Sequence, residues 1–489
     1  MKVENSILDD RSPGSFIEYN SVLVHEYSHW LQHQGTTFGT FLSALKYTQE
    51  STALTFLREI PKPVMRRLWQ RREKEAIPIV TIDSISQYFK PQSYLANTDD
   101  LNIFGQIWFD SQWVYSFMND CNTIANPSGQ IFGDTISDVF LHSYFYNDRL
   151  SSSEITEMRQ WYSFDDKEIR IIRFRNQFIT SKLLMECQAT LSELQLMIKY
   201  SFSFSKLYSF EKYFIRRLDS LSNTSYGLPL EIFHSLLHLN PASNFSLIEI
   251  DRICTTVNIL INIALNPPLP LFNLGPPTNA RSWQWQDIYP PLRFIRAIEA
   301  VKKIGMIEYM PTHAQTKEFI NKIVFVSQIP TVIENDFKES KIFRKIDFSD
   351  KSLLMTENMF DSHDYLYWVQ KKLAKLRENS INFLTNFANC QFGETSTELL
   401  NIIFDNSPIQ FIKPPFYWLS NDRMASEDNA KFHNGLLRRV ALNYCLFDAI
   451  VGIGDFDLQE FPPEISMSEN FKGYVKINMY NLIVDTYNT

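Results

Sequence analysis

Hydrophobic residues recur at helical spacing along most of the chain. Near the N-terminus the pattern predicts helices over residues 21–34 and 38–60, and later a long helix over 168–201. Further helices are predicted at 134–146, 151–162, 291–305, 314–325, 364–390, 395–405 and 428–452. Asn20 or Ser21 can cap the start of the first helix, and Gly35 suits a left-handed conformation at its end. The pattern therefore favours a mainly α protein.

Alternation of apolar and polar residues predicts few strands. The segment PIVTIDSISQYF, residues 78–89, alternates well enough for one or two strands, and SFIEY at 15–19 reads as a short strand in an irregular lead-in. Glycine is scarce, with 14 residues, which argues against a sandwich or barrel. The expected fold class is thus α+β in a mainly α chain.

One segment interrupts the helical pattern clearly. It runs from Asn266 to Pro291, contains seven prolines, and is either a linker or an ordered surface loop. No internal repeat flanks it. A division into residues 1–265 and 266–489 is the expected domain organisation.

Composition narrows the classes of function. The chain has 489 residues and a formal net charge of -8, which argues against broad nucleic-acid binding. Its most apolar stretch is interrupted by Asn258, Asn262 and Asn266 and falls short of the roughly 20 apolar residues of a membrane span. The first residues lack the apolar segment of a signal peptide. A cytoplasmic protein with no membrane or nucleic-acid partner is expected.

The cysteines support a reducing compartment. There are five, an odd number, and no two lie close in the sequence: Cys121, Cys187, Cys254, Cys390 and Cys445. This distribution fits neither a disulfide framework nor a cysteine-ligated zinc site.

The segment VLVHEYSHWLQHQG, residues 22–35, carries the strongest chemical signal. Its HEYSH matches the pattern H-E-x-x-H, and on a helix His25 and His29 share one face, so both can bind a single ion. Glu26, rotated by about 100°, would flank the ion and accept a proton from a metal-bound water. The alternative is a buried helix whose histidines are hydrogen-bonded to other side chains.

A third ligand must come from elsewhere in the chain. His33 lies about 12 Å from His25 along the same helix axis, so it is expected behind the ligands or on the surface and not as a ligand itself. Glu186 and Glu50 are the candidates, since each lies on a predicted helix with an alanine three residues later. A small residue there lets two helices approach closely. Glu186 is favoured, because a helix returning antiparallel after Gly35 would carry Glu50 about 10 Å past His29.

HEYSH, the LQ that follows it (Leu31 and Gln32) and a glutamate helix together resemble the gluzincin metallopeptidases, in which two histidines and a later glutamate hold zinc. The resemblance implies a zincin-like catalytic region with a small sheet, here followed by a large helical region. One departure is Thr190, or Leu54, where many gluzincins place an aspartate four residues after the ligand. Glu193, seven residues after Glu186 on the same helix face, could bond a ligand histidine or a substrate amine.

Two functions follow from this sequence. The first is a Zn²⁺-dependent peptidase with ligands His25, His29 and Glu186, in which Glu26 activates zinc-bound water to hydrolyse peptide bonds. Its partners would be a protein or peptide substrate and a regulatory protein. The alternative is a helical interaction or sensor protein that the same metal stabilises, without protease activity.

Overall fold

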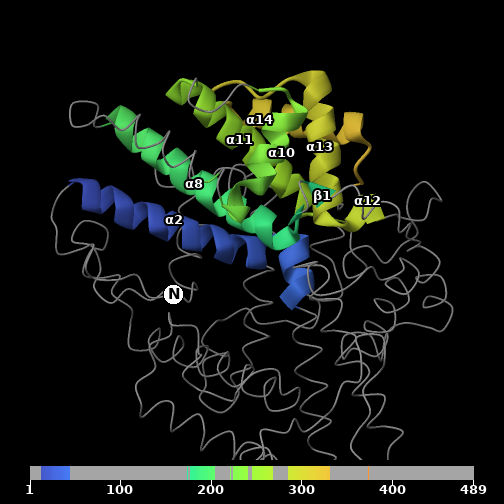
Figure 1. Cartoon of the computed structure of the whole chain (residues 1–489), viewed down its shortest axis with the longest axis horizontal. Coiled ribbons are helices and arrows are strands. Elements are labelled where there is room, and N and C mark those ends of the chain that lie inside the picture. Colours follow the sequence, from blue (N-terminus) through green and yellow to red (C-terminus); the bar gives the residue numbers. More distant parts are fainter. Residues whose placement is uncertain are drawn as a thin grey trace, which may run out of the picture.

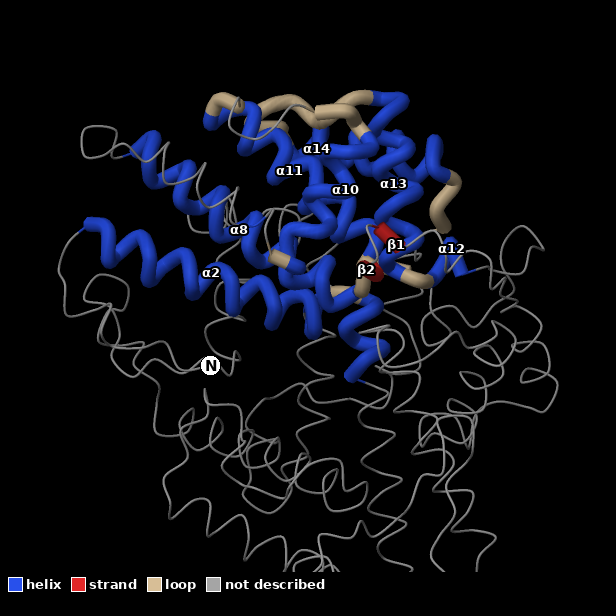
Figure 2. Tube along the Cα trace, in the orientation of Figure 1, coloured by secondary structure: helices blue, strands red, loops and turns tan. Residues whose placement is uncertain are grey.

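The computed structural model describes residues 13–43, 173–174, 177–203, 221, 224–239, 245–267, 285–330 and 373. Within these ranges the chain is predominantly helical, which confirms the expectation of a mainly α protein (Figures 1 and 2). Several predicted elements lie outside them: the strand at 78–89 and the helices at 134–146, 151–162, 364–390, 395–405 and 428–452.

Helix α2 spans Pro13–Gly35 and carries the HEYSH motif. The expectation of a strand at 15–19 was wrong, because the helix already includes these residues. Proline has a backbone φ suited to the first helical position, and no glycine or proline interrupts residues 15–34.

The end of α2 also differs from the prediction. Gly35 does not adopt positive φ; Gly305 is the glycine with positive φ among the described residues. The hydroxyl of Thr36 marks the end instead, since it donates to the carbonyl of Gln32 (2.6 Å) and accepts from the backbone N–H of Gly39 (2.9 Å). Helical structure resumes at residue 37 and continues to residue 43, the last described residue of this segment.

Helix α8 spans Ser181–Ser203. Strands β1 (Arg173–Phe174) and β2 (Gln177–Phe178) precede it and pair antiparallel. The predicted helix over 168–201 therefore began too early. Thr180 explains the later start, because its hydroxyl accepts from the backbone N–H of Leu183 (3.1 Å) and so caps the first turn.

The remaining described elements form a helical layer on α8. They are η3 (Ser225–Gly227), α10 (Leu228–Leu236), α11 (Leu247–Ala264), α12 (Trp285–Ile288), α13 (Pro290–Ile304) and α14 (His313–Ser327). Helices α2 and α11 both pack on α8, α13 packs on α11, and α14 packs on α13 (Figure 1). The predictions of helices at 291–305 and 314–325 are confirmed by α13 and α14.

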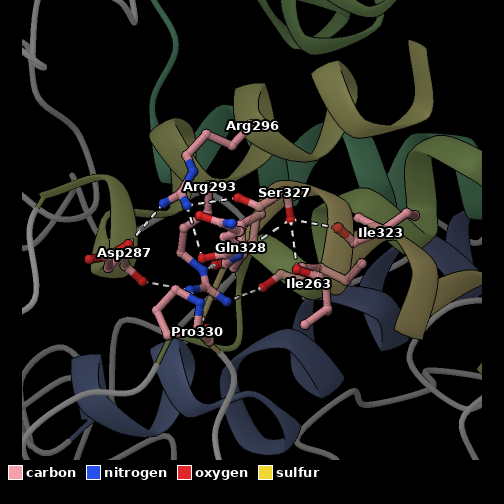
Figure 3. A network of polar contacts seen from close by, with 11 residues as sticks. Ile263, Asp287, Arg293, Arg296, Ile323, Ser327, Gln328 and Pro330 are labelled. Carbon is pink, nitrogen blue, oxygen red and sulfur yellow. Dashed lines mark hydrogen bonds and ion pairs between the residues drawn. The ribbon is translucent and has the colours of Figure 1, made fainter. Parts of the chain in front are cut away.

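Helix α11 ends at the expected domain boundary near residue 265, and hydrogen bonds join its end to α13 on the other side of that boundary. The carbonyls of Ile263 and Ala264 at the C-terminus of α11, and that of Asn266 just beyond it, accept hydrogen bonds from the guanidinium of Arg293 in α13 (Figure 3). Arg293 is fully buried. The described helices on the two sides of residue 265 thus share one packed interior, and the boundary itself stays a prediction.

Helix α11 comes from the most apolar stretch of the sequence, yet no described helix is both long enough and apolar enough to cross a membrane. Its Asn258 is fully buried and donates to the side chain of Gln195 in α8 (2.8 Å). Cys187 and Cys254, the two cysteines in the described residues, are buried free thiols.

Candidate metal centre

The two histidines of HEYSH lie one helical turn apart on α2 and face the same point. Their Nε2 atoms are 3.2 Å apart, and the rings meet edge to face with centroids 4.8 Å apart. Because the side chains of residues i and i+4 share a helix face, this arrangement follows from the local sequence once the helix forms.

Glu186 of α8 completes a group of three. Its Oε2 lies 3.3 Å from Nε2 of His29 and 3.7 Å from Nε2 of His25. The two helices run antiparallel here, since His25, His29 and Gln32 along α2 meet Glu193, Glu186 and Met185 along α8. Ala189, one turn after Glu186, is fully buried. Among the described residues, His25, His29 and Glu186 form the group that could hold a metal ion. Glu50, the other candidate, lies outside the described residues.

The spacing of these three atoms suits a small tetrahedral ion. A tetrahedron with metal–ligand bonds of about 2.0–2.1 Å has edges of about 3.3–3.4 Å. The observed separations are 3.2, 3.3 and 3.7 Å. Two imidazole nitrogens and one carboxylate oxygen are also a ligand set that zinc accepts in catalytic sites. The residues present therefore fit the ion.

The charge of the group favours a cation as well. Burial would lower the pKa of His25, but Glu186 and Glu193 outweigh it and raise this pKa to about 9. Burial would likewise raise the pKa of Glu186, but the hydrogen bonds to His25 and His29 hold it well below its usual range. In metal-free protein His25 is therefore protonated at neutral pH. Its positive charge is stabilised by the same carboxylates that would stabilise a bound cation.

Glu26 lies beside this group on α2 and is half-buried. Burial raises the pKa of its carboxyl group above the ordinary value, although the positive charges of His25 and His29 oppose the rise. A carboxylate with a raised pKa is a better proton acceptor near neutral pH than a solvated one.

Glu193 contacts His25 from the other side of the ring. Its Oε2 lies 3.7 Å from Nδ1 of His25, and its side chain is 5% exposed. Thr190 cannot play this part, because its hydroxyl donates to the backbone carbonyl of Glu186 (2.9 Å). The carboxylate near His25 therefore comes from Glu193, seven residues after Glu186, and not from the position four residues after it.

Gln32 contacts the site, although sequence reasoning assigned it no role there. Its Oε1 lies 2.9 Å from Nδ1 of His29, and its amide nitrogen donates to α8. The available signal was its position three residues after His29 on the same helix face, within the apolar surroundings of WLQHQG.

Other histidines lie apart from the group. His33 is half-buried, and burial together with the charge of His29 lowers its pKa to about 4, so it is neutral at pH 7. His234 of α10 packs edge to face against Phe245, and burial lowers its pKa.

Comparison of the chain with protein-family models, with curated proteins and with solved structures finds no match in any of the three. The resemblance to gluzincins thus depends on the motif and the glutamate helix alone, and what it implies stays a proposal.

Proposed function

We propose that this protein is a zinc-dependent metallopeptidase whose ion is held by His25, His29 and Glu186. One observation carries the proposal: three atoms of zinc-ligand type, from helices more than 150 residues apart in sequence, lie at the separations of tetrahedral coordination. The three side chains are 20%, 23% and 19% exposed, so the group is not sealed from solvent.

Each residue has a defined part in hydrolysis. Bound zinc supplies a Lewis acid that lowers the pKa of water to about 7 and polarises a carbonyl oxygen. Glu26 accepts the proton of the attacking water and returns it to the leaving amine. Glu193 orients His25 through its Nδ1 side.

The wider architecture belongs to the same proposal. Helices α2 and α8 form the centre of a zincin-like region with a small sheet, within residues 1–265. Residues 266–489 form the helical region that follows. The substrate is a protein or peptide in the cytoplasm, and a regulatory protein partner restrains the enzyme.

Metal analysis of the purified full-length protein, with a peptide-library cleavage assay, tests the function. The expected result is about one zinc per chain and cleavage that a chelator abolishes and zinc restores. Glu26→Gln should keep zinc and lower the cleavage rate by at least about 100-fold. Glu186→Gln should lose zinc, while Glu299→Gln, an exposed glutamate of α13, should behave as wild type.

Two results would overturn the proposal in different ways. Stoichiometric zinc with no cleavage of any peptide would favour the alternative, a metal-stabilised helical interaction or sensor protein. If the wild-type protein binds no divalent ion, both the metallopeptidase and the metal-stabilised sensor protein are excluded.

A further inference from the structure

The side-chain amide of Gln32 links His29 to α8. Its Oε1 lies 2.9 Å from Nδ1 of His29. Its Nε2 lies 2.9 Å from the backbone carbonyl of Met185 and 2.9 Å from Oε1 of Gln188. Gln32 is 1% exposed and Gln188 is 4% exposed, so solvent does not replace these bonds.

Two backbone carbonyls determine which way both amides point. The NH₂ group of Gln188 donates to the carbonyl of Asn258 (3.1 Å), and a carbonyl can only accept. Gln188 therefore turns its Oε1 toward Gln32. The carbonyl of Met185 requires the NH₂ group of Gln32 in the same way. Reversing either amide would set oxygen against oxygen in a buried site.

The direction of the Gln32 amide determines which ring nitrogen of His29 carries a proton. Since Gln32 turns its Oε1 to His29, the ring atom Nδ1 must be the donor and carry a proton. When a metal ion takes the lone pair of Nε2, the ring therefore keeps its single proton on Nδ1. Nε2 of His29 lies 3.3 Å from Glu186 and 3.2 Å from Nε2 of His25, inside the candidate ligand group.

We propose that Gln32 is a positioning residue that holds His29 in the tautomer presenting Nε2 to the metal ion, with its own direction determined by the Met185 carbonyl and by Gln188. The inference rests on the proposed metal site for its purpose. The hydrogen bonds that carry it are present without an ion, so it can be tested in metal-free protein.

The first experiment needs no variant. Long-range ¹H–¹⁵N spectra of full-length protein labelled with ¹⁵N-histidine distinguish protonated from unprotonated ring nitrogens, and His29→Gln identifies the signals of His29. We expect a proton on Nδ1 of His29 both in metal-free and in Zn²⁺-loaded protein. A bare Nδ1 in wild type would overturn the inference.

The second experiment compares four variants by the same spectra and by competition with a chromophoric zinc chelator. Gln32→Met should lose the preference for the Nδ1–H tautomer and weaken zinc binding about 10–100-fold. Gln32→Glu keeps the oxygen that accepts from His29 and should retain the tautomer, but its second oxygen faces the Met185 carbonyl, so the variant should also be less stable. Gln188→Met should have a smaller effect than Gln32→Met, because the Met185 carbonyl still directs Gln32.

Gln195→Met is the matched control. Gln195 is a fully buried glutamine of α8 that donates to Asp251 and Thr255 and accepts from the side chain of Asn258, and no described hydrogen bond joins it to a residue of the metal group. Its loss tests the general cost of removing a buried amide, and zinc affinity should stay within about twofold. Equal affinity and an unchanged tautomer in Gln32→Met would contradict the inference.

The two proposals fail separately. If wild type binds no zinc but His29 carries its proton on Nδ1, the positioning survives and the metallopeptidase does not. If wild type binds zinc while Gln32→Met changes neither tautomer nor affinity, the metal site survives and the role of Gln32 does not.

Discussion

The carboxylate of Glu193 lies 3.7 Å from Nδ1 of His25, the ring nitrogen that does not face Glu186. The two histidines of the motif are therefore approached differently from their Nδ1 sides. His25 meets a charged group from the neighbouring helix, and His29 meets the neutral amide of Gln32 from its own helix. An imidazole that faces a carboxylate donates electrons to a bound metal ion more strongly than an imidazole that faces a neutral amide.

Replacing Glu193 should weaken the metal site without destroying it. Glu193→Gln keeps a hydrogen-bond acceptor near His25 but removes a negative charge, so zinc affinity should fall about tenfold, and Glu193→Leu should cost more. Chelator competition measures both, with Glu299→Gln as the control for an exposed glutamate. An unchanged affinity in Glu193→Leu would show that the 3.7 Å contact does not matter for the ion.

The metal-free protein should lose stability in mildly alkaline solution. Glu186 and Glu193, against the effect of burial, raise the pKa of His25 from 6.5 to about 9. Its proton therefore contributes stability that is fully present below pH 6.5 and is lost as the pH rises through 9. Urea unfolding at pH 6, 7.5 and 9.5 measures this loss.

Zinc provides the control for that dependence. Bound zinc takes the place of the proton, so the zinc-loaded protein should not show the alkaline loss attributed to His25. His25→Gln without metal should also show a shallower dependence than wild type. A wild-type unfolding free energy that stays constant from pH 6.5 to 9 in metal-free protein would contradict the prediction.

Gly39 allows the chain to turn closely after α2. A Cβ atom at this position would overlap backbone atoms of Gln32 and His33, which cannot move aside as a flexible side chain can. Gly39→Ala should therefore lower the free energy of unfolding by about 1–3 kcal/mol and also weaken zinc binding, because it displaces the end of the metal helix.

Gly305→Ala is the comparison for that experiment. Gly305 has φ of 85° and open space around it, so this variant should cost about 1 kcal/mol through backbone strain and leave zinc binding unchanged. If Gly39→Ala also left zinc binding unchanged, the turn would not support the metal site.

Arg293 connects α13 to the end of α11 in a way that lysine cannot reproduce. Its guanidinium donates to five backbone carbonyls, those of Ile263, Ala264, Asn266, Asp287 and Pro330 (Figure 3). Lysine has three donors on one atom and cannot span them. Arg293→Lys should destabilise the protein by at least about 3 kcal/mol, because buried carbonyls lose their partners.

The half-exposed Arg296, one turn from Arg293, is the matched control. It bonds the carboxylate of Asp287 (2.8 Å) and the carbonyls of Ser327 and Gln328. Because water can replace part of these contacts, Arg296→Lys should cost about 1 kcal/mol. Thermal or urea unfolding measures both variants, and equal losses would contradict the special role of the buried arginine.

Some features of this protein follow from short stretches of sequence. Helical periodicity alone places His25 and His29 on one face of α2, with Glu26 beside them, because both depend on spacing within two turns. The helices α13 and α14 follow similarly from local signals, including the capping box of Thr312 and Gln315. The same reasoning was wrong at residues 15–19, which the helix includes, and at Gly35, which does not adopt positive φ.

Tertiary structure decided the rest. Helical spacing names Glu186 and Glu50 as candidates and favours Glu186, but only the packing of α8 on α2 brings Glu186 to within 3.3 Å of His29. The contacts of Glu193 and of Gln32 likewise join residues more than 150 positions apart. Local spacing determines what one helix presents, whereas the relative position of two helices depends on close packing of side chains that no local pattern encodes.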